Sequence, residues 1–354
     1  MPYLFQLPII TQLTIQQQAV LNATGAVAVS GGPGTGKSVV SLWRHIRNHN
    51  MGTRNSLLLT YTKSLEYYLK YSASLEDESA GENVNRTYWW TTHLANNEYS
   101  EIIVDEAQDV EEEKYHQIKG LTPMVSYSAD DNQILYPNKQ TSQTRLAEIF
   151  PDNHCFTLEE NYRNTYEITQ FVRALFPRNL ITVGQENGPK SRVVLSGSSI
   201  DKQVKIVTDI INIFSSDAHN IAILLPLIKC HAHEYQTVNY WHERLSNNGV
   251  TCSKFTNEEG DLGVIENVHI TTFKSSKGLE FDTLIVPNIN MFNRNTANLN
   301  VVKPNDYYVV FTRAKRNLYL IDDSEVNGNI CTLPFMQVAI QRNIVEVDAS
   351  YITV

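Results

Sequence analysis

The feature that most constrains the fold of this chain is the segment GGPGTGKS at residues 31–38. A run of small and β-branched residues precedes it and predicts a buried strand, and a helix-forming segment that begins at Lys37 follows it. The segment matches G-x-x-x-x-G-K-[ST], in which the glycines let backbone amides surround a phosphate without Cβ clashes. The sequence therefore predicts a strand, a phosphate-binding loop and a helix in that order.

Apolar runs elsewhere in the chain predict further strands. They are rich in Val, Ile and Leu, which is typical of strands buried on both faces of a parallel sheet. The predicted strands lie at residues 26–31, 56–61, 101–106, 124–128, 155–158, 192–197, 221–226, 268–273, 283–289 and 317–322. Because the pattern restarts after the run at 155–158, we expect two α/β domains, 1–156 and 157–354, each a mainly parallel sheet flanked by helices.

The composition excludes several classes of protein. A formal net charge of −9 excludes a purely electrostatic coat for nucleic acid, so any nucleic acid has to lie in a local groove. The four cysteines are far apart in the sequence, which argues against a disulfide framework or a zinc ribbon and favours a cytoplasmic location. No apolar run approaches the roughly 18 residues that cross a bilayer, so no membrane partner is expected.

The glycine-rich segment and a second, acidic motif predict an ATP site with Mg²⁺. Lys37 is expected to reach the β- and γ-phosphates, and Ser38 to hold Mg²⁺. Asp105 and Glu106 end the apolar run EIIVDE, where a carboxylate can bind Mg²⁺ and its neighbour can polarise the attacking water. The nucleotide-binding residues of the loop are Gly31, Gly32, Pro33, Gly34, Thr35, Gly36, Lys37 and Ser38.

Further segments extend this pattern over nearly the whole chain. With the P-loop and DEAQD at 105–109, they resemble the superfamily 1 helicases, specifically the UvrD/Rep/PcrA-like branch, in that family's motif order. The segments are LTIQQQAV at 13–20 (Q motif), TYTKSL at 60–65 (motif Ia), VNRTYWW at 84–90 (Ib), SADDNQILY at 128–136 (III), LEENYRN at 158–164 (IV), TTFKSSKGLEFD at 271–282 (V) and YVVFTRAK at 308–315 (VI). The resemblance implies two RecA-like P-loop NTPase domains.

The resemblance assigns roles to further residues around ATP. A glutamine of the Q motif reads the adenine edge. The spacing is one residue off the usual pattern, so Gln16 and Gln17 both remain candidates, and we favour Gln17. Gln133 is expected to sense the γ-phosphate, and Tyr162 to stack on the adenine.

The second predicted domain is expected to complete the ATP site. Glu280 of motif V would approach the ribose or the triphosphate, and Gly278 of the same motif is also expected to bind ATP. Arg163 and Arg313 would act as arginine fingers, each worth about 10³–10⁵ in rate. Because the P-loop belongs to the first domain, the resemblance implies that ATP is hydrolysed at the interface between the two.

The resemblance also implies a path for nucleic acid across both domains. Hydroxyl, amide and cationic groups of motifs Ia, Ib and V would contact phosphates, and such contacts carry no sequence code. The expected contact residues are Thr60, Tyr61, Lys63, Thr87, Thr272 and Lys274.

The chain departs from the family pattern at several positions. The segments between motifs Ib and II and between motifs IV and V are short, which leaves little room for the accessory domains of larger relatives. Motif III lacks the aromatic residue that usually stacks on a base, because Tyr136 is followed by Pro-Asn, unless Tyr136, Trp89 or Trp90 replaces it. Lys274 stands where relatives commonly have histidine.

The resemblance implies an enzyme, an ATP-dependent translocase or helicase on single-stranded nucleic acid, DNA in preference to RNA, with 3′-to-5′ polarity. The alternative is an ATP-driven sensing or regulatory subunit that unwinds little by itself and works with a partner such as a nuclease in DNA repair or antiviral defence. The expected lack of accessory domains favours the alternative, and the complete ATPase set favours the first. A nucleotide-binding protein without a nucleic-acid ligand is disfavoured by motifs Ia and V.

Overall fold

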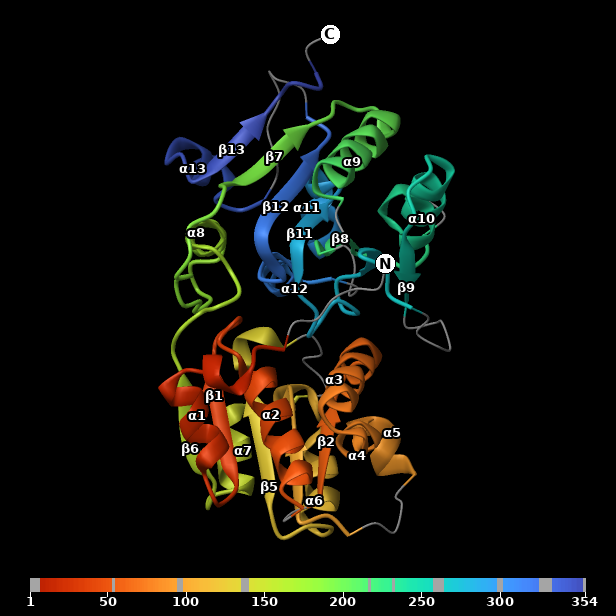
Figure 1. Cartoon of the computed structure of the whole chain (residues 1–354). Helices are drawn as coiled ribbons and strands as arrows, with labels where there is room; N and C mark the ends of the chain where they lie inside the picture. The colour runs from red at the N-terminus through yellow and green to blue at the C-terminus, as the bar shows by residue number, and fades with distance from the viewer. Residues whose placement is uncertain are drawn as a thin grey trace. The chain divides into compact units, whose positions relative to one another are not determined.

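A computed structural model describes residues 7–52, 55–93, 98–134, 140–215, 218–230, 233–256, 264–297, 302–324 and 333–352 of the chain. The contacts divide the chain into two compact units, which meet in the sequence between Asn161 and Tyr162 (Figure 1). No helix among the described residues is long and apolar enough to span a membrane.

The first unit is a parallel sheet with helices on both faces. Its strand order is β3-β2-β4-β5-β1-β6, and every strand pair is parallel. Its elements are η1 (Ile10–Gln12), α1 (Ile15–Asn22), β1 (Val27–Gly31), α2 (Lys37–Asn50), β2 (Ser56–Thr60), α3 (Lys63–Glu76), α4 (Glu78–Glu82), β3 (Val84–Arg86), α5 (Thr87–Thr92), β4 (Glu101–Val104), η2 (Ala107–Asp109), α6 (Glu112–Lys119), β5 (Val125–Ala129), η3 (Asp131–Gln133), α7 (Gln143–Ile149) and β6 (His154–Leu158).

The alternation of side chains along a strand explains why both faces of this sheet are covered. In β2, Leu57 and Leu59 point to one face, where they pack with residues of α5, α6 and α7. Leu58 points to the other face, where it packs with residues of α1, α2, α3 and α4. All three leucines are fully buried, which is why β2 reads as an unbroken apolar run.

The second unit is a parallel sheet as well. Its strand order is β13-β7-β12-β11-β8-β10-β9, again with only parallel pairs. Its elements are α8 (Tyr166–Leu175), β7 (Ser191–Leu195), α9 (Ile200–Phe214), β8 (Ile221–Leu225), η4 (Glu234–Gln236), α10 (Val238–Asn247), β9 (Ser253–Phe255), β10 (Val268–Thr272), β11 (Phe281–Val286), η5 (Ile289–Met291), α11 (Phe292–Ala297), α12 (Pro304–Phe311), β12 (Ala314–Asp322), α13 (Met336–Gln341) and β13 (Val345–Asp348).

The two parallel sheets confirm the predicted fold class, and the differences in detail lie at the sheet edges. The strands β3, β9 and β13 were not predicted, and all three are edge strands. Each of these three strands has a single neighbour and is only partly buried, and each lacks the apolar run that identifies a central strand.

The division between the units also differs from the predicted boundary at residues 156/157. The edge strand β6, which contains Phe156, pairs along its whole length with β1 and completes the first sheet. A boundary at residue 156 would cut this strand, and the contacts place the division after Asn161 instead.

Two deeply buried histidines, one in each unit, have disfavoured charged forms. His45 of α2 lies with Nε2 2.8 Å from the Ala80 carbonyl and Nδ1 2.9 Å from Ser56 Oγ. Since a carbonyl only accepts, Nε2 carries the proton and Nδ1 accepts from the serine. Burial lowers the pKa of His45 to about 3, and burial lowers the pKa of His269 in β10 to about 3 as well.

We expect the free energy of unfolding to fall as the pH drops from about 6.5 towards 3. Below pH 6.5 the unfolded chain binds protons on His45 and His269 that the folded chain does not bind, so protonation favours unfolding. At pH 5 each histidine lowers the free energy of unfolding by about 2 kcal/mol relative to its value at pH 7. Urea unfolding at pH 7 and pH 5 measures this, and His45→Gln should remove about half of the histidine-dependent difference. An identical pH dependence in the wild type and in His45→Gln would contradict it.

Candidate active site

The residues predicted to bind ATP gather at one edge of the first sheet. In a parallel sheet all strands end at the same edge. The P-loop follows β1 there, Asp105 follows β4, and Asp130 follows β5, which lies between β1 and β4. Ligands of open α/β sheets bind outside this edge, so the sheet order itself brings the motifs together.

The backbone of the P-loop requires glycine at Gly36, which precedes α2. Its φ is +89°, a left-handed conformation, and a Cβ there would lie 2.5 Å from Gln17 Nε2. Gln17 is buried and donates from Nε2 to the Thr35 carbonyl at 3.1 Å. The loop and the Q-motif glutamine are thus in direct contact.

The two candidate glutamines of the Q motif occupy different environments. Gln17 forms a capping box with Thr14 at the start of α1, with bonds of 3.0 and 3.2 Å, and also contacts the P-loop. Gln16 is exposed and accepts a long 3.5 Å hydrogen bond from the Glu159 amide. Of the two, Gln17 is the one attached to the P-loop.

The helix α1 is held at its other end by a buried arginine of α2. Arg44 donates to three backbone carbonyls at the end of α1 and in the turn that follows, at 2.7–3.1 Å. It also pairs with the buried Glu101 of β4 at 2.7 Å, and Glu101 accepts from Asn48 at 2.8 Å. This network fixes α1, α2 and β4 relative to one another.

Lys37 lies over the loop where phosphates are expected. Its Nζ donates to the carbonyls of Gly31 and Gly32 at 2.7 and 3.0 Å and lies 3.8 Å from Asp130 Oδ2. The lysine is buried, so its charge is poorly screened and acts strongly on a bound anion.

Asp105 fits the role of a Mg²⁺ ligand. It is buried, its Oδ1 accepts from Ser128 Oγ, and its Oδ2 has no hydrogen-bond partner. Burial and the adjacent Glu106 charge raise the pKa of Asp105, while hydrogen bonds from Ser128 and Ser38 and the charge of Lys37 oppose the rise. An orphaned carboxylate oxygen beside a serine hydroxyl and a lysine suits a hard cation.

The metal would need ligands from outside the protein. Among the described residues no group of three His, Cys, Asp or Glu side chains could hold a metal ion. Mg²⁺ commonly binds with one or two carboxylates plus phosphate oxygens and water. Ser38 and Asp105 are the side chains that would hold it here, and the ion would neutralise charge on a bound triphosphate.

Glu106 is held in a strained conformation at this edge. Its φ is +55°, in the left-handed region that non-glycine residues rarely adopt. The buried carboxylate accepts from Gln108 Nε2 at 2.5 Å through Oε2. Strain of this kind costs about 1–3 kcal/mol and is concentrated at functional sites.

Two residues without a predicted role link the predicted ones. Asp130 accepts from Gln133 Nε2 at 2.7 Å and lies near Lys37, and its own amide donates to Gln108 Oε1 at 3.1 Å. Gln108 in turn donates to Glu106. A chain of contacts therefore joins Lys37, Gln133 and Glu106. Asp130 and Gln108 belong to segments that resemble motifs III and II, but only the fold shows which residues they contact.

In the second unit, the predicted arginine fingers gather around Glu280. Arg163 Nε lies 2.7 Å from Glu280 Oε2. Burial raises the pKa of Glu280, but the charges of Arg163, Lys315 and Arg313 outweigh it, and the pKa lies below its usual value. Arg313 is 1% exposed and donates to the carbonyls of Val309 and Leu279 at 3.1 and 3.5 Å.

The other two predicted ATP residues of the second unit differ in exposure. Tyr162, predicted to stack on the adenine, is 50% exposed. Gly278 has a φ of +83°, in the left-handed region, and lies two residues before Glu280.

Three of the predicted nucleic-acid contacts are buried. Thr60 ends β2, and its carbonyl accepts from Thr87 Oγ1 at 3.2 Å. Thr272 ends β10 and bonds through its hydroxyl to Ser275 at 2.9 Å. Tyr61, Lys63 and Lys274 are partly exposed. Because Thr60 pairs in register with Arg86 on β3, motifs Ia and Ib leave the sheet side by side.

The candidates for the missing base-stacking residue also differ in exposure. Trp90 is buried, with its ring edge-on to Tyr99 at 6.3 Å. Trp89 is exposed, and Tyr136 lies outside the described residues.

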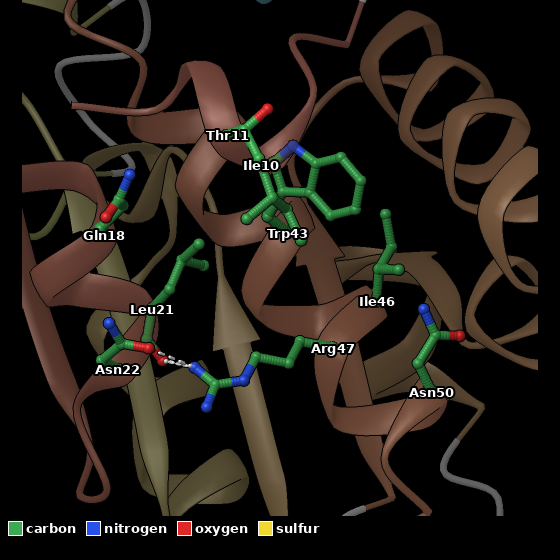
Figure 2. A pocket seen from close by; sticks show the side chains of 9 residues that line it. All are labelled: Ile10, Thr11, Gln18, Leu21, Asn22, Trp43, Ile46, Arg47 and Asn50. Atoms are coloured by element: carbon green, nitrogen blue, oxygen red, sulfur yellow. Dashed lines mark hydrogen bonds between the residues drawn. The ribbon is translucent and has the colours of Figure 1, made fainter.

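A cavity of about 480 Å³ lies elsewhere in the first unit, between η1, α1 and α2 (Figure 2). Arg47 on its wall donates to the Leu21 carbonyl at 2.7 Å and to Asn22 Oδ1 at 3.0 Å. The α2 residues that line it, from Trp43 to Asn50, lie roughly 9–20 Å along the helix from Lys37. The cavity is therefore not part of the phosphate site.

Comparisons with known proteins place helicases among the similar structures. No protein-family model matches the chain, and no curated protein matches it. The C-terminal domain of a possible DNA helicase from Lactobacillus plantarum WCFS1 is 23% identical, with a TM-score of 0.38, over 53% of this chain and 98% of that domain. Arterivirus nonstructural protein 10, a helicase, is 13% identical, with a TM-score of 0.44, over 87% of this chain and 61% of that one. The helicase of PRRSV is 12% identical, with a TM-score of 0.44, over 90% and 57%. The chain thus spans about three fifths of the two viral helicase chains, and similarity at this level assigns no activity to it.

Proposed function

We propose that this protein is an ATPase that moves along single-stranded nucleic acid, as a translocase or helicase. The observation that carries the proposal is the convergence of Lys37, Ser38, Asp105 and Glu106 at the carboxyl edge of one parallel sheet. This set provides a phosphate-binding cation, Mg²⁺ ligands and a carboxylate next to them. Its cofactors are ATP and Mg²⁺.

Each residue of the set has a distinct part in the proposed reaction. Lys37 exchanges its contacts with the loop carbonyls for contacts with the β- and γ-phosphates. Glu106 accepts a proton from the attacking water, and Gln108 keeps its carboxylate in place. Gln133 contacts the γ-phosphate, and its bond to Asp130 connects that contact to Lys37.

We further propose that Arg163 and Arg313 complete the site from the second unit. Arginine neutralises charge that develops on the transferred phosphoryl group. The pairing of Arg163 with Glu280 keeps the guanidinium ordered until phosphate oxygens compete for it. Hydrolysis would then be coupled to the approach and separation of the units, which is how a motor of this kind advances along a strand.

The proposed ligand is single-stranded nucleic acid, with DNA favoured over RNA, 3′-to-5′ polarity and a cytoplasmic location, as the sequence resemblance implies. Motif Ia begins at the end of β2, which lies next to β4, and motif Ib includes β3, the next strand outward, so nucleic acid bound there would lie on the β4 side of the ATP site. The net charge of −9 disfavours a broad electrostatic interface, so contacts are few and local.

The second candidate function is an ATP-driven sensing or regulatory subunit of a repair or antiviral-defence complex, for example with a nuclease. The observation that favours it is the short connection between motifs Ib and II, where β4 begins at Glu101 soon after α5 ends at Thr92. Such a subunit would hydrolyse ATP on nucleic acid but separate strands poorly.

Steady-state ATPase measurements test the proposal. We expect hydrolysis to require Mg²⁺ and to increase with single-stranded DNA, and Lys37→Ala to abolish it, because the phosphates lose their cation. A rate that does not respond to single-stranded DNA or RNA would contradict the nucleic-acid part. A strand-displacement assay on the same protein then distinguishes a helicase from the sensing subunit.

A further inference from the structure

The short helix α5 presents an exposed aromatic surface that the proposed ATP site does not use. Tyr88 is 63% exposed and Trp89 is 44% exposed, whereas the next residue, Trp90, is 3% exposed and packs in the core. The chain has four tryptophans, and the others, Trp43 and Trp241, are 5% and 0% exposed. Trp89 is therefore the one tryptophan of the chain with a substantially exposed ring.

The ring of Trp89 is already ordered by its neighbour one helical turn on. His93 stacks on it with a centroid distance of 4.7 Å and an interplanar angle of 17°. His93 Nδ1 lies 2.9 Å from the Trp89 carbonyl, which can only accept, so Nδ1 donates and holds the imidazole in place. A ring fixed in this way loses little conformational entropy when a ligand stacks on it.

The position of this surface points to nucleic acid as its ligand. Thr87, which starts α5, donates to the carbonyl of Thr60 at the end of β2. Tyr88 and Trp89 therefore lie within the segment that resembles motif Ib, in the helix that follows β3 at the carboxyl edge of the sheet. An exposed aromatic ring in that place can stack on the flat face of any base, so binding would not depend on the nucleotide sequence.

Charge near the surface is compatible with a polyanion but modest. Lys114 Nζ lies 5.6 Å from the centre of the Tyr88 ring. Glu112 on the same helix, α6, is bonded to Arg145 at 2.6 and 2.9 Å, so its charge is compensated. Stacking must then supply more of the affinity than ion pairing at this surface.

We propose that Trp89, backed by His93, is a base-stacking platform for single-stranded nucleic acid, and that Tyr88 extends it. This inference rests on the proposed function, because it specifies where the nucleic acid is held.

Tryptophan fluorescence provides a direct test on the full chain. We expect titration with an oligodeoxythymidine to quench the emission, because stacking affects the one exposed tryptophan. Trp89→Phe should abolish the quenching and retain most of the affinity, since phenylalanine still stacks. Trp89→Ala should weaken binding by about 5- to 150-fold, the range measured for loss of one base–aromatic stack. The matched control is Tyr71→Ala, an exposed aromatic on α3 that is 57% exposed, which should bind as the wild type does.

An abasic oligonucleotide of the same length separates stacking from phosphate contacts. Wild type and Trp89→Ala should bind it equally, because it offers no base. Binding of the oligodeoxythymidine that is unchanged in Trp89→Ala, or quenching that persists in Trp89→Phe, would overturn the platform while leaving the proposed function intact. Unchanged oligonucleotide binding in Trp89→Ala would also be expected if this surface bound a protein and not a nucleic acid. If the wild type bound no oligonucleotide of either kind, the nucleic-acid part of the proposed function would fail first.

Discussion

Glu106→Gln is expected to lower the kcat for ATP by about 10²–10⁴ and to leave nucleotide affinity within a few-fold of the wild type. The amide has nearly the same shape but cannot accept the proton of the attacking water. The variant also loses a negative charge beside Asp105, which should not weaken the binding of a polyanionic nucleotide. Single-turnover hydrolysis and the affinity for a fluorescent ATP analogue measure the two quantities separately.

Two further variants serve as comparisons for Glu106→Gln. Lys37→Ala should lose affinity as well as turnover, so it shows what damage to the phosphate site looks like. Gln108→Ala removes the hydrogen bond that holds the Glu106 carboxylate and should lower kcat by less than Glu106→Gln does. Near-normal turnover in Glu106→Gln would mean that another group accepts the proton.

Arg163→Ala is expected to reduce kcat by about 10³–10⁵, the range for an arginine finger, with a much smaller effect on nucleotide affinity. Arg163 is the better finger to test because it is partly exposed and contacts a side chain, Glu280. Arg313 is 1% exposed and bonded to backbone carbonyls, so its loss would disturb the fold as well. Arg163→Lys should remain badly impaired, because lysine lacks the planar fork that binds two oxygens.

A surface arginine provides the control for Arg163. Arg192 pairs with Glu346 at 3.0 Å on the second unit, outside the site, and Arg192→Ala should keep full turnover. If Arg163→Ala also kept full turnover, its contact with Glu280 would be only an internal ion pair of the second unit. The proposal that this unit completes the ATP site would then rest on Arg313 alone.

The central strands could be predicted from the sequence because their signal is local. A strand buried on both faces needs an unbroken apolar run, as Leu57, Leu58 and Leu59 show. The edge strands β3, β9 and β13 lack this run, since each pairs with one strand only and is partly buried. The predicted boundary at residues 156/157 cut β6 for a different reason, because the sheet that this strand joins is set by its pairing with β1, a segment far away in the sequence.

In the candidate site, too, the sequence predicted what depends on local residues and missed what depends on distant contacts. The residue types of the P-loop and of the Asp105–Glu106 pair are dictated locally, because a phosphate loop needs left-handed glycines and a strand end needs a carboxylate to bind a cation. The sequence by itself therefore determined which residues could do chemistry and that they belong to parallel α/β units.

Only the tertiary structure decided which of these residues meet. It brought Gln17 rather than Gln16 against the P-loop, made Asp130 and Gln108 the links between Lys37, Gln133 and Glu106, and left Trp89 exposed while it buried Trp90. Such choices depend on strand order and on which face of a helix packs inward. Both are set by contacts between residues far apart in the chain, which no local pattern of residues records.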